Sequence, residues 1–174
     1  MPAARLITTL AIFMRLQVAS SSFSVTILRH AETEWNVRGM LQGSKDSGLT
    51  ERGLEQARLC GQRLRKQVFT TCYTSPLPRA KLTAELVLRR MDMPPPIEVD
   101  ERLRERAFGD WEGMVWKDIE EQFPDDVVKS RNDADFKISG GGESRNECLA
   151  RSLEFLSELP KMHSPDERRV RALS

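Results

Sequence analysis

An arginine and a histidine stand side by side at the end of the first strand-like segment of the chain. Arg29 and His30 follow residues 23–28, whose apolar and β-branched side chains predict a buried strand. In an open α/β sheet, ligands bind beyond the carboxyl ends of the strands, so this pair lies where a ligand is expected. An imidazole with a pKa of about 6.5 is largely neutral at neutral pH and can act as a nucleophile. His30 is therefore the candidate nucleophile, and the cation beside it favours a phosphate ester as substrate.

A nucleophile of this kind needs donors for the phosphoryl oxygens. Arg29 and Arg79 are candidates because a guanidinium group can grip a phosphate through two parallel hydrogen bonds. Asn36 and Gln42 are candidates for additional neutral donors. Taken singly, each arginine is more often a surface cation, so that alternative stays open.

The oxygen that leaves phosphorus needs a proton, and Glu105 is the candidate acid. It stands between Arg104 and Arg106 in a polar segment. Closeness to a bound phosphate would raise the pKa of its carboxyl and so favour proton donation. The alternative is an exposed ion pair between Glu105 and a neighbouring arginine, and for His30 the alternative is a buried core histidine.

Alternating strand-like and helix-like segments are expected to position these side chains. After the first strand, the sequence predicts a helix that begins at the N-cap Thr50. The later predicted elements are a strand over 69–74, a helix over 79–90, a short strand over 97–99, a helix over 115–122, a solvated excursion over 124–136 and a last helix that begins after Ser144 with Glu147 in a capping box. Strands that alternate with helices are typical of a parallel sheet, so the fold class is α/β.

Composition restricts the class of protein. A chain of 174 residues with 27 basic and 26 acidic side chains fits one domain without a net field for a polyanion, so no nucleic-acid partner is expected. Cys60, Cys72 and Cys148 lack metal-ligand spacing and are expected to be buried thiols in a reducing compartment. The two histidines and scattered carboxylates form no ligand cluster, so neither a metal nor another cofactor is expected.

The first 22 residues differ from the rest of the chain. Residues 6–14 are mostly apolar, arginines flank them, and no acidic residue precedes Glu32. The apolar run is too short to cross a bilayer, so stable membrane insertion is not expected. The segment fits a mitochondrial presequence, a weak secretory signal or an unstructured extension. The cytoplasm is the expected location with the mitochondrion as the alternative, and the folded domain is expected to span residues 23–174.

Several motifs occur in the same order as in the histidine phosphatase superfamily, which is also called phosphoglycerate mutase-like. The segments that resemble this family are Leu28–Asn36, its phosphohistidine motif; Leu41–Gly43 and Leu49–Gly53, the loop and helix start after it; Ser75–Ala84, its second arginine motif; Leu103–Gly113, its proton-donor segment; and Gly141–Ser144, a later substrate-side loop. The resemblance covers the chain from about Phe23 to Leu159.

This resemblance implies a fold and a set of roles. The fold would be a three-layer sandwich with a mostly parallel central sheet and helices on both faces. His30 would accept the phosphoryl group, and Glu105 would be the acid. Substrate binding would fall to Arg29, Asn36, Gln42, Gly43 and Arg79.

The chain departs from the family pattern at one point. The family uses a second histidine, followed by glycine at the end of another core strand, and this chain contains only His30 and His163. His163 lies in a proline-bounded loop and is not expected to substitute for it. Residues 170–173 resemble the family segment on the carboxyl-terminal side of that second histidine. The strand and its histidine are therefore expected to be missing from an incomplete carboxyl-terminal part, through truncation, splicing or a faulty gene model.

The expected activity is hydrolysis of a small phosphorylated metabolite, of the sugar phosphate or bisphosphate class. The segment from Gly113 to Gly141 is short, whereas the mutases of the family carry a longer insertion there. The segments around Glu105 and Glu143 resemble phosphatases that include relatives of fructose-2,6-bisphosphatase. Two alternatives stay open: a catalytically impaired isoform or pseudoenzyme, and phosphoryl transfer of the phosphoglycerate mutase type.

Overall fold

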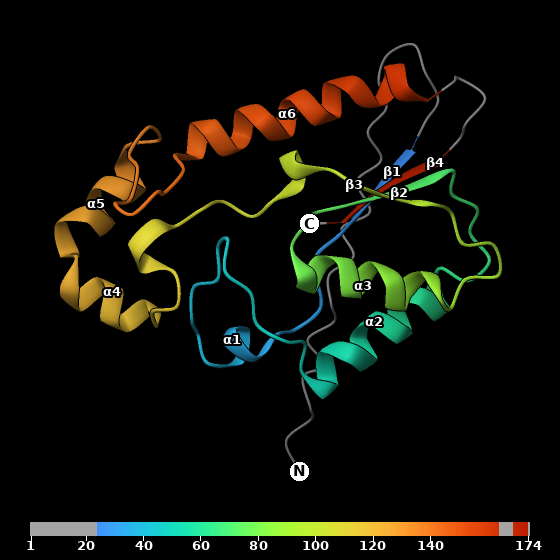
Figure 1. Ribbon diagram of the computed structural model, residues 1–174, viewed down its shortest axis with the longest axis horizontal. Helices are drawn as coiled ribbons and strands as arrows, with labels where there is room; N and C mark the ends of the chain where they lie inside the picture. The colour runs from blue at the N-terminus through green and yellow to red at the C-terminus, as the bar shows by residue number, and fades with distance from the viewer. Residues whose placement is uncertain (1–23, 164–168, 174) are drawn as a thin grey trace.

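The computed structural model of the protein describes residues 24–163 and 169–173. Four strands form one parallel sheet in the order β1-β4-β2-β3 (Figure 1). The strands are β1 (Ser24–Leu28), β2 (Thr71–Thr74), β3 (Ile97–Val99) and β4 (Arg169–Leu173). The α/β class and the parallel sheet predicted from the sequence are confirmed.

Two helices begin at the caps that the sequence predicts. The Thr50 hydroxyl accepts a hydrogen bond from the Gly53 amide (2.9 Å), and Ser144 and Glu147 form a reciprocal capping box. The helices of the described part are α1 (Glu34–Val37), α2 (Glu51–Arg63), α3 (Pro78–Leu88), α4 (Trp116–Gln122), α5 (Pro124–Asn132) and α6 (Arg145–Met162).

Different helices pack on the two faces of the sheet. Leu28 of β1 and Cys72 of β2 belong to the core cluster that contains residues of α2 and α3. Val25 and Tyr73, on the same two strands, belong to a second cluster with Phe155 of α6. Because side chains alternate along a strand, α2 and α3 cover one face and α6 covers the other, as Figure 1 shows. This arrangement confirms the three-layer sandwich.

A third apolar cluster lies apart from the sheet. Ile119 of α4 and Val127 of α5 pack with Trp111 and Ile138. The helices α4 and α5 lie at the left of Figure 1. The segment over residues 124–136, predicted as a solvated excursion, is mostly exposed, but it contains the helix α5, which buries Val127 in this cluster. Each segment contributes only one or a few apolar residues to this cluster. No single segment therefore shows the periodic apolar pattern that would have predicted it.

The structure also corrects the expectation that a core strand is missing. Residues Arg169–Leu173 form β4, which pairs in parallel with β1 on one side and with β2 on the other. The physical reason is that β1 and β2 each present unpaired backbone groups, which a short segment of nearly alternating sequence can satisfy. β4 contains no histidine, and the absence of the second family histidine stays a prediction.

Residues 1–22, to which the sequence assigns an extension or targeting segment, lie outside the described residues. Within the described ranges, no helix combines the length and apolar character needed to cross a membrane.

Candidate active site

A cavity of about 470 Å³ opens at the carboxyl ends of β1 and β2. It brings together four of the seven predicted site residues. Its charged or titratable lining residues include Arg29, His30, Arg79, Arg104, Glu105 and Arg106. Five of these six side chains are arginine or histidine, so the cavity favours an anionic ligand.

His30 is buried just beyond β1, and a hydrogen bond fixes its tautomer. Its Nδ1 lies 2.8 Å from the carbonyl oxygen of Ala31. A carbonyl oxygen can only accept, so Nδ1 carries the proton of the neutral ring and donates it to this bond. The lone pair of the neutral imidazole is then on Nε2, which is the form that a nucleophile requires.

The surroundings of His30 favour this neutral form. Burial lowers the pKa of His30 below its ordinary value, and the positive charges of Arg79 and Arg29 lower it further. The hydrogen bond to Ala31 and the nearby carboxylate of Glu105 act in the opposite direction, and the net pKa remains lowered. At neutral pH the imidazole is therefore uncharged.

Arg79 is held rigidly at the start of α3. Its Nη1 donates to the Lys45 carbonyl oxygen (2.8 Å) and to the Asp46 carboxylate (2.9 Å), and its Nη2 donates to the Gly43 carbonyl oxygen (2.9 Å). The side chain is almost fully buried, and its Nε has no hydrogen-bond partner among the described residues. An unsatisfied buried donor costs roughly 1–3 kcal/mol, which a bound anion would relieve.

Gly43 supports Arg79 through its backbone. Its φ of +55° is in the left-handed region, and a side chain there would collide with the carboxylate of Glu112. This conformation presents the Gly43 carbonyl to Arg79, so the structure gives Gly43 a supporting contact. Gly43 is not among the residues that line the 470 Å³ cavity.

Asn36 and Gln42 also lie outside the cavity lining, so the structure does not bring them together with His30. Asn36 forms a capping box with Thr33, the N-cap of α1: its Oδ1 accepts from the Thr33 backbone amide (3.1 Å), and its backbone amide donates to Thr33 Oγ1 (3.2 Å). Buried Gln42 accepts a hydrogen bond from the Ser47 hydroxyl (3.2 Å). Their substrate contacts stay predictions, and only the amide NH₂ groups remain to make them.

Glu105 lies exposed at the edge of the cavity, and its carboxylate accepts a hydrogen bond from the Arg106 amide (3.2 Å). Arg106 itself is a candidate ligand that the sequence did not single out. Its Nη2 is buried and has no partner within the described part of the chain, whereas its Nε donates to the Glu143 carbonyl (2.8 Å). Burial lowers the pKa of this guanidinium. A bound anion would satisfy the unpartnered nitrogen.

His163, the other histidine, lies elsewhere. Its Nε2 is 2.9 Å from the Tyr73 hydroxyl, on the α6 side of the sheet, and it is not among the residues that line the cavity. This placement agrees with the expectation that His163 does not replace the second family histidine. No group of three metal-ligating side chains occurs within the described ranges.

Comparison with known proteins adds independent information. The sequence pattern of the histidine phosphatase superfamily (branch 1) matches residues 25–171. A metal-independent phosphoserine phosphatase of Arabidopsis thaliana is 37% identical over 152 residues, which are 85% of this chain and 63% of that protein. A 2,3-bisphosphoglycerate-dependent phosphoglycerate mutase of Nitrobacter winogradskyi is 36% identical over 134 residues, with coverage of 75% and 65%. The chain thus spans just under two thirds of these relatives.

A solved structure shows the same architecture. The mycobacterial glucosyl-3-phosphoglycerate phosphatase in complex with VO3 superposes with a TM-score of 0.73 at 33% identity, over 84% of this chain and 72% of that one. The family pattern covers both strands that carry the candidate site, β1 and β2, and the helices between them. The chain belongs to the histidine phosphatase superfamily.

Proposed function

We propose that the protein hydrolyses phosphate monoesters of small metabolites through a phosphohistidine at His30. The observation that carries the proposal is the state of this side chain: a buried imidazole, protonated on Nδ1 and neutral at neutral pH, in a cavity that it shares with Arg29 and Arg79. The unpartnered Nε of Arg79 supplies a fixed donor for a phosphoryl oxygen.

In the first step, the Nε2 lone pair of His30 attacks phosphorus. The N–P bond forms while the bond between phosphorus and the ester oxygen breaks, and its electron pair leaves on that oxygen. Glu105, at the edge of the cavity, gives the leaving oxygen a proton. Arg29 and Arg79 neutralise the charge on the phosphoryl oxygens.

In the second step, water attacks the phosphohistidine. The Glu105 carboxylate accepts a proton from this water while the new P–O bond forms. The N–P bond breaks, its electron pair returns to Nε2 of His30, and inorganic phosphate is released. The proton that Glu105 gave to the leaving oxygen is thereby replaced from water, and the imidazole is neutral again.

The charge of the cavity supports a substrate class. Arg29, Arg79, Arg104 and Arg106 face a single acidic side chain, Glu105, in the lining. Arg79 and Arg104 already pair with the carboxylates of Asp46 and Glu101, and a phosphate monoester, with a charge of about −1.5 to −2 at neutral pH, offsets the remaining positive charge. A second anionic group on the substrate, a carboxylate or another phosphate, would satisfy the buried Nη2 of Arg106, which has no partner among the described residues. Phosphoserine and phosphoglycerate esters, which appear in the names of the relatives, have this chemistry.

Phosphoryl transfer between metabolites is the second candidate, since a phosphoglycerate mutase is among the relatives. Both reactions share the phosphohistidine and differ in its acceptor. Release of inorganic phosphate that does not depend on a second phosphoglycerate favours the phosphatase, whereas transfer of label from one phosphoglycerate to another favours the mutase.

The experiment is a labelling series with a radiolabelled phosphate monoester. Wild-type protein is expected to acquire label that acid removes and base does not, as for phosphohistidine, and His30→Ala is expected to acquire none. His163→Gln is the matched control, because His163 lies outside the cavity, and it should label like the wild type. Undiminished labelling of His30→Ala would refute the assignment. Absence of label on the wild type would favour the non-catalytic alternative.

A further inference from the structure

One arginine of α6 uses all of its hydrogen-bonding capacity inside the protein. Arg151 Nε and Nη2 donate to the two carboxylate oxygens of Glu143 (2.6 and 2.7 Å). Its Nη1 donates to the carbonyl oxygens of Arg102 and Arg104 (2.7 Å each), and Nη2 also donates to that of Glu105 (3.3 Å). A guanidinium group has five N–H bonds, so none remains for a substrate.

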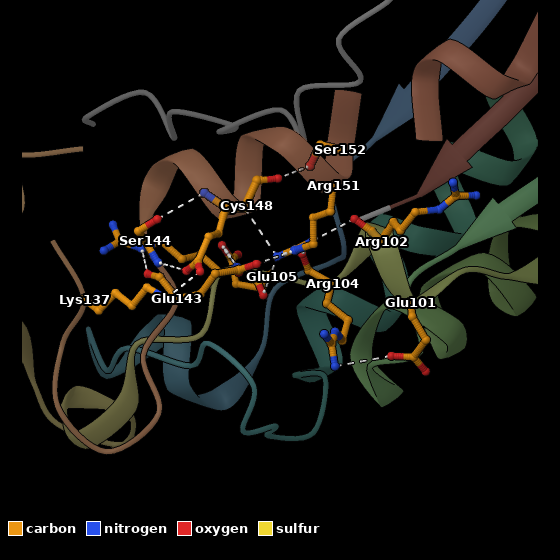
Figure 2. A network of polar contacts seen from close by, with 12 residues as sticks. Glu101, Arg102, Arg104, Glu105, Lys137, Glu143, Ser144, Cys148, Arg151 and Ser152 are labelled. Atoms are coloured by element: carbon orange, nitrogen blue, oxygen red, sulfur yellow. Dashed lines mark hydrogen bonds and ion pairs between the residues drawn. The ribbon is translucent and has the colours of Figure 1, made fainter. Parts of the chain in front are cut away.

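Glu143 makes two further hydrogen bonds to the segment of residues 102–107. Its amide donates to the Ala107 carbonyl (2.8 Å), and its own carbonyl accepts from Nε of Arg106 (2.8 Å). Arg151 hydrogen bonds lower the pKa of the Glu143 carboxyl, which is therefore charged at neutral pH. Figure 2 shows the result: Glu143 and Arg151 lie together beside the segment that carries Glu105.

These contacts surround the candidate proton donor without reaching the reacting atoms. Neither Arg151 nor Glu143 lines the 470 Å³ cavity that holds His30, whereas Glu105 does; the three residues also line a second hollow of about 540 Å³, in which His30 takes no part. The Glu105 carboxylate is exposed, and the only hydrogen bond recorded for it among the described residues comes from the neighbouring Arg106 amide. The position of the carboxyl group therefore depends on the backbone of residues 102–107, which Arg151 and Glu143 hold.

We propose that Arg151 and Glu143 are positioning residues that hold the backbone of Glu105 where its carboxyl group can protonate the leaving oxygen. The proposal rests on the proposed phosphatase function, and it assigns no direct substrate contact to either residue. The proposed positioning depends on the planar guanidinium group of Arg151. A lysine would keep the charge, but its three donors cannot span both carboxylate oxygens and three carbonyl oxygens in this geometry.

The test compares two esters that differ in their need for an acid. 4-Nitrophenolate is a stable anion that leaves without a proton, whereas the alkoxide of glycerol 3-phosphate requires one. Because both esters share the second step, the comparison uses kcat/KM, which reports only the steps up to loss of the leaving group. Arg151→Lys is expected to lower kcat/KM for glycerol 3-phosphate by at least about tenfold, and for 4-nitrophenyl phosphate by less than about threefold. Glu105→Gln should give the same selective loss, and the double variant should be no slower than Glu105→Gln alone.

Arg102→Lys is the matched control. Arg102 also joins this segment to α6, through Glu158 (2.7 Å), but its side chain does not contact residues 104–107 in any recorded bond. We expect it to leave the ratio of the two kcat/KM values unchanged. If Arg151→Lys slows both esters equally, the residue has a general structural role and the proposal is wrong.

Amide hydrogen exchange tests the same point without turnover. In Arg151→Lys, peptides that cover residues 104–107 should exchange at least about tenfold faster, while those of α2 and α3 keep their rates. Unchanged exchange at 104–107 would overturn the proposal whatever the activity. Failure of the phosphatase function is recognised separately, because His30→Ala would then retain its label.

Discussion

Spare hydrogen-bonding capacity separates the arginines of the site into two kinds. Arg151 has no N–H group left for a ligand, whereas Arg79 and Arg106 each keep one buried nitrogen without a partner in the described structure. Leaving such a donor buried costs roughly 1–3 kcal/mol, so an oxyanion that accepts from it binds more tightly. At the scale of the residue, the hydrogen bonds that an arginine already makes thus separate the arginines that can bind a ligand from the one that only positions its neighbours.

Arg79→Ala is expected to weaken binding of inorganic phosphate and vanadate by about 10- to 100-fold, since a hydrogen bond to a charged group contributes roughly 1.5–3 kcal/mol. Isothermal titration calorimetry measures the Kd. Arg89→Ala is the control, because this arginine of the end of α3 is largely exposed and pairs only with Glu85 in the recorded ion pairs. Equal affinities for wild type and Arg79→Ala would place Arg79 outside the binding site.

The pKa of His30 is expected to lie below its ordinary value, because burial disfavours the charged ring and the cations at Arg79 and Arg29 add to the effect. Nitrogen NMR of the two histidines, with His30→Ala for assignment, gives this value and also the Nδ1-protonated tautomer. Arg29→Gln removes a nearby positive charge and should raise the pKa. Arg38→Gln, at an exposed arginine outside the cavity, should leave it unchanged. A titration of His30 above its ordinary pKa would contradict the account.

The same shift has a consequence for stability. The unfolded chain binds a proton at His30 with an ordinary pKa of about 6.5, and the folded chain binds it only at lower pH. As pH falls from about 6.5 through the folded pKa, the unfolded state takes up more protons, so the free energy of unfolding decreases. Above about pH 6.5 the group contributes no pH dependence. His30→Ala should remove this component of the pH profile.

At the scale of the element, the sequence predicted those features that interactions between residues close in sequence determine. Thr50 and Ser144 predict where α2 and α6 begin, because an N-cap is a contact within one turn of the helix. The four-residue α1 escaped prediction, since it is too short for an apolar period. The role of Arg151 escaped as well, because its acceptors are backbone carbonyls far away in the sequence, and no residue type marks them.

Ser144→Ala should lower the free energy of unfolding by about 1 kcal/mol, within the range of roughly 0.5–2 that N-cap losses cost. Its hydroxyl accepts from the Glu147 amide (3.1 Å) and is buried at the start of α6. Urea unfolding followed by circular dichroism measures the change. The control is Ser157→Ala, at an exposed position within α6. A loss no larger than that of the control would mean that the cap does not stabilise the helix.

At the scale of the molecule, the two halves of the site follow strands that are not neighbours. Arg29 and His30 follow β1 and Arg79 follows β2, and β4 lies between these strands in the sheet. The α/β class and the four lining residues were predictable from motifs at strand ends. The position of β4 was not, because pairing partners in a parallel sheet are set by contacts that are remote in sequence.

A proline in β4 should therefore disturb folding and ligand binding together. Val170 pairs with Val25 of β1 and with Thr71 of β2, so Val170→Pro removes a backbone donor in the middle of the sheet. We expect the free energy of unfolding to fall by about 3 kcal/mol or more, and vanadate binding to weaken because β1 and β2 lose their common partner. Urea unfolding and calorimetry measure the two effects.

Val99→Pro supplies the matched control in an edge strand. Among the described strands, β3 pairs only with β2. The hydrogen bonds from the Cys72 amide to the Pro96 carbonyl and from the Asp100 amide to the Thr74 carbonyl place the Val99 amide on the outer side. Proline there removes no recorded sheet bond, so both stability and vanadate affinity should change less than in Val170→Pro. If the two variants behave alike, β4 does not join β1 to β2 in solution, and the site must be held together by the helices alone.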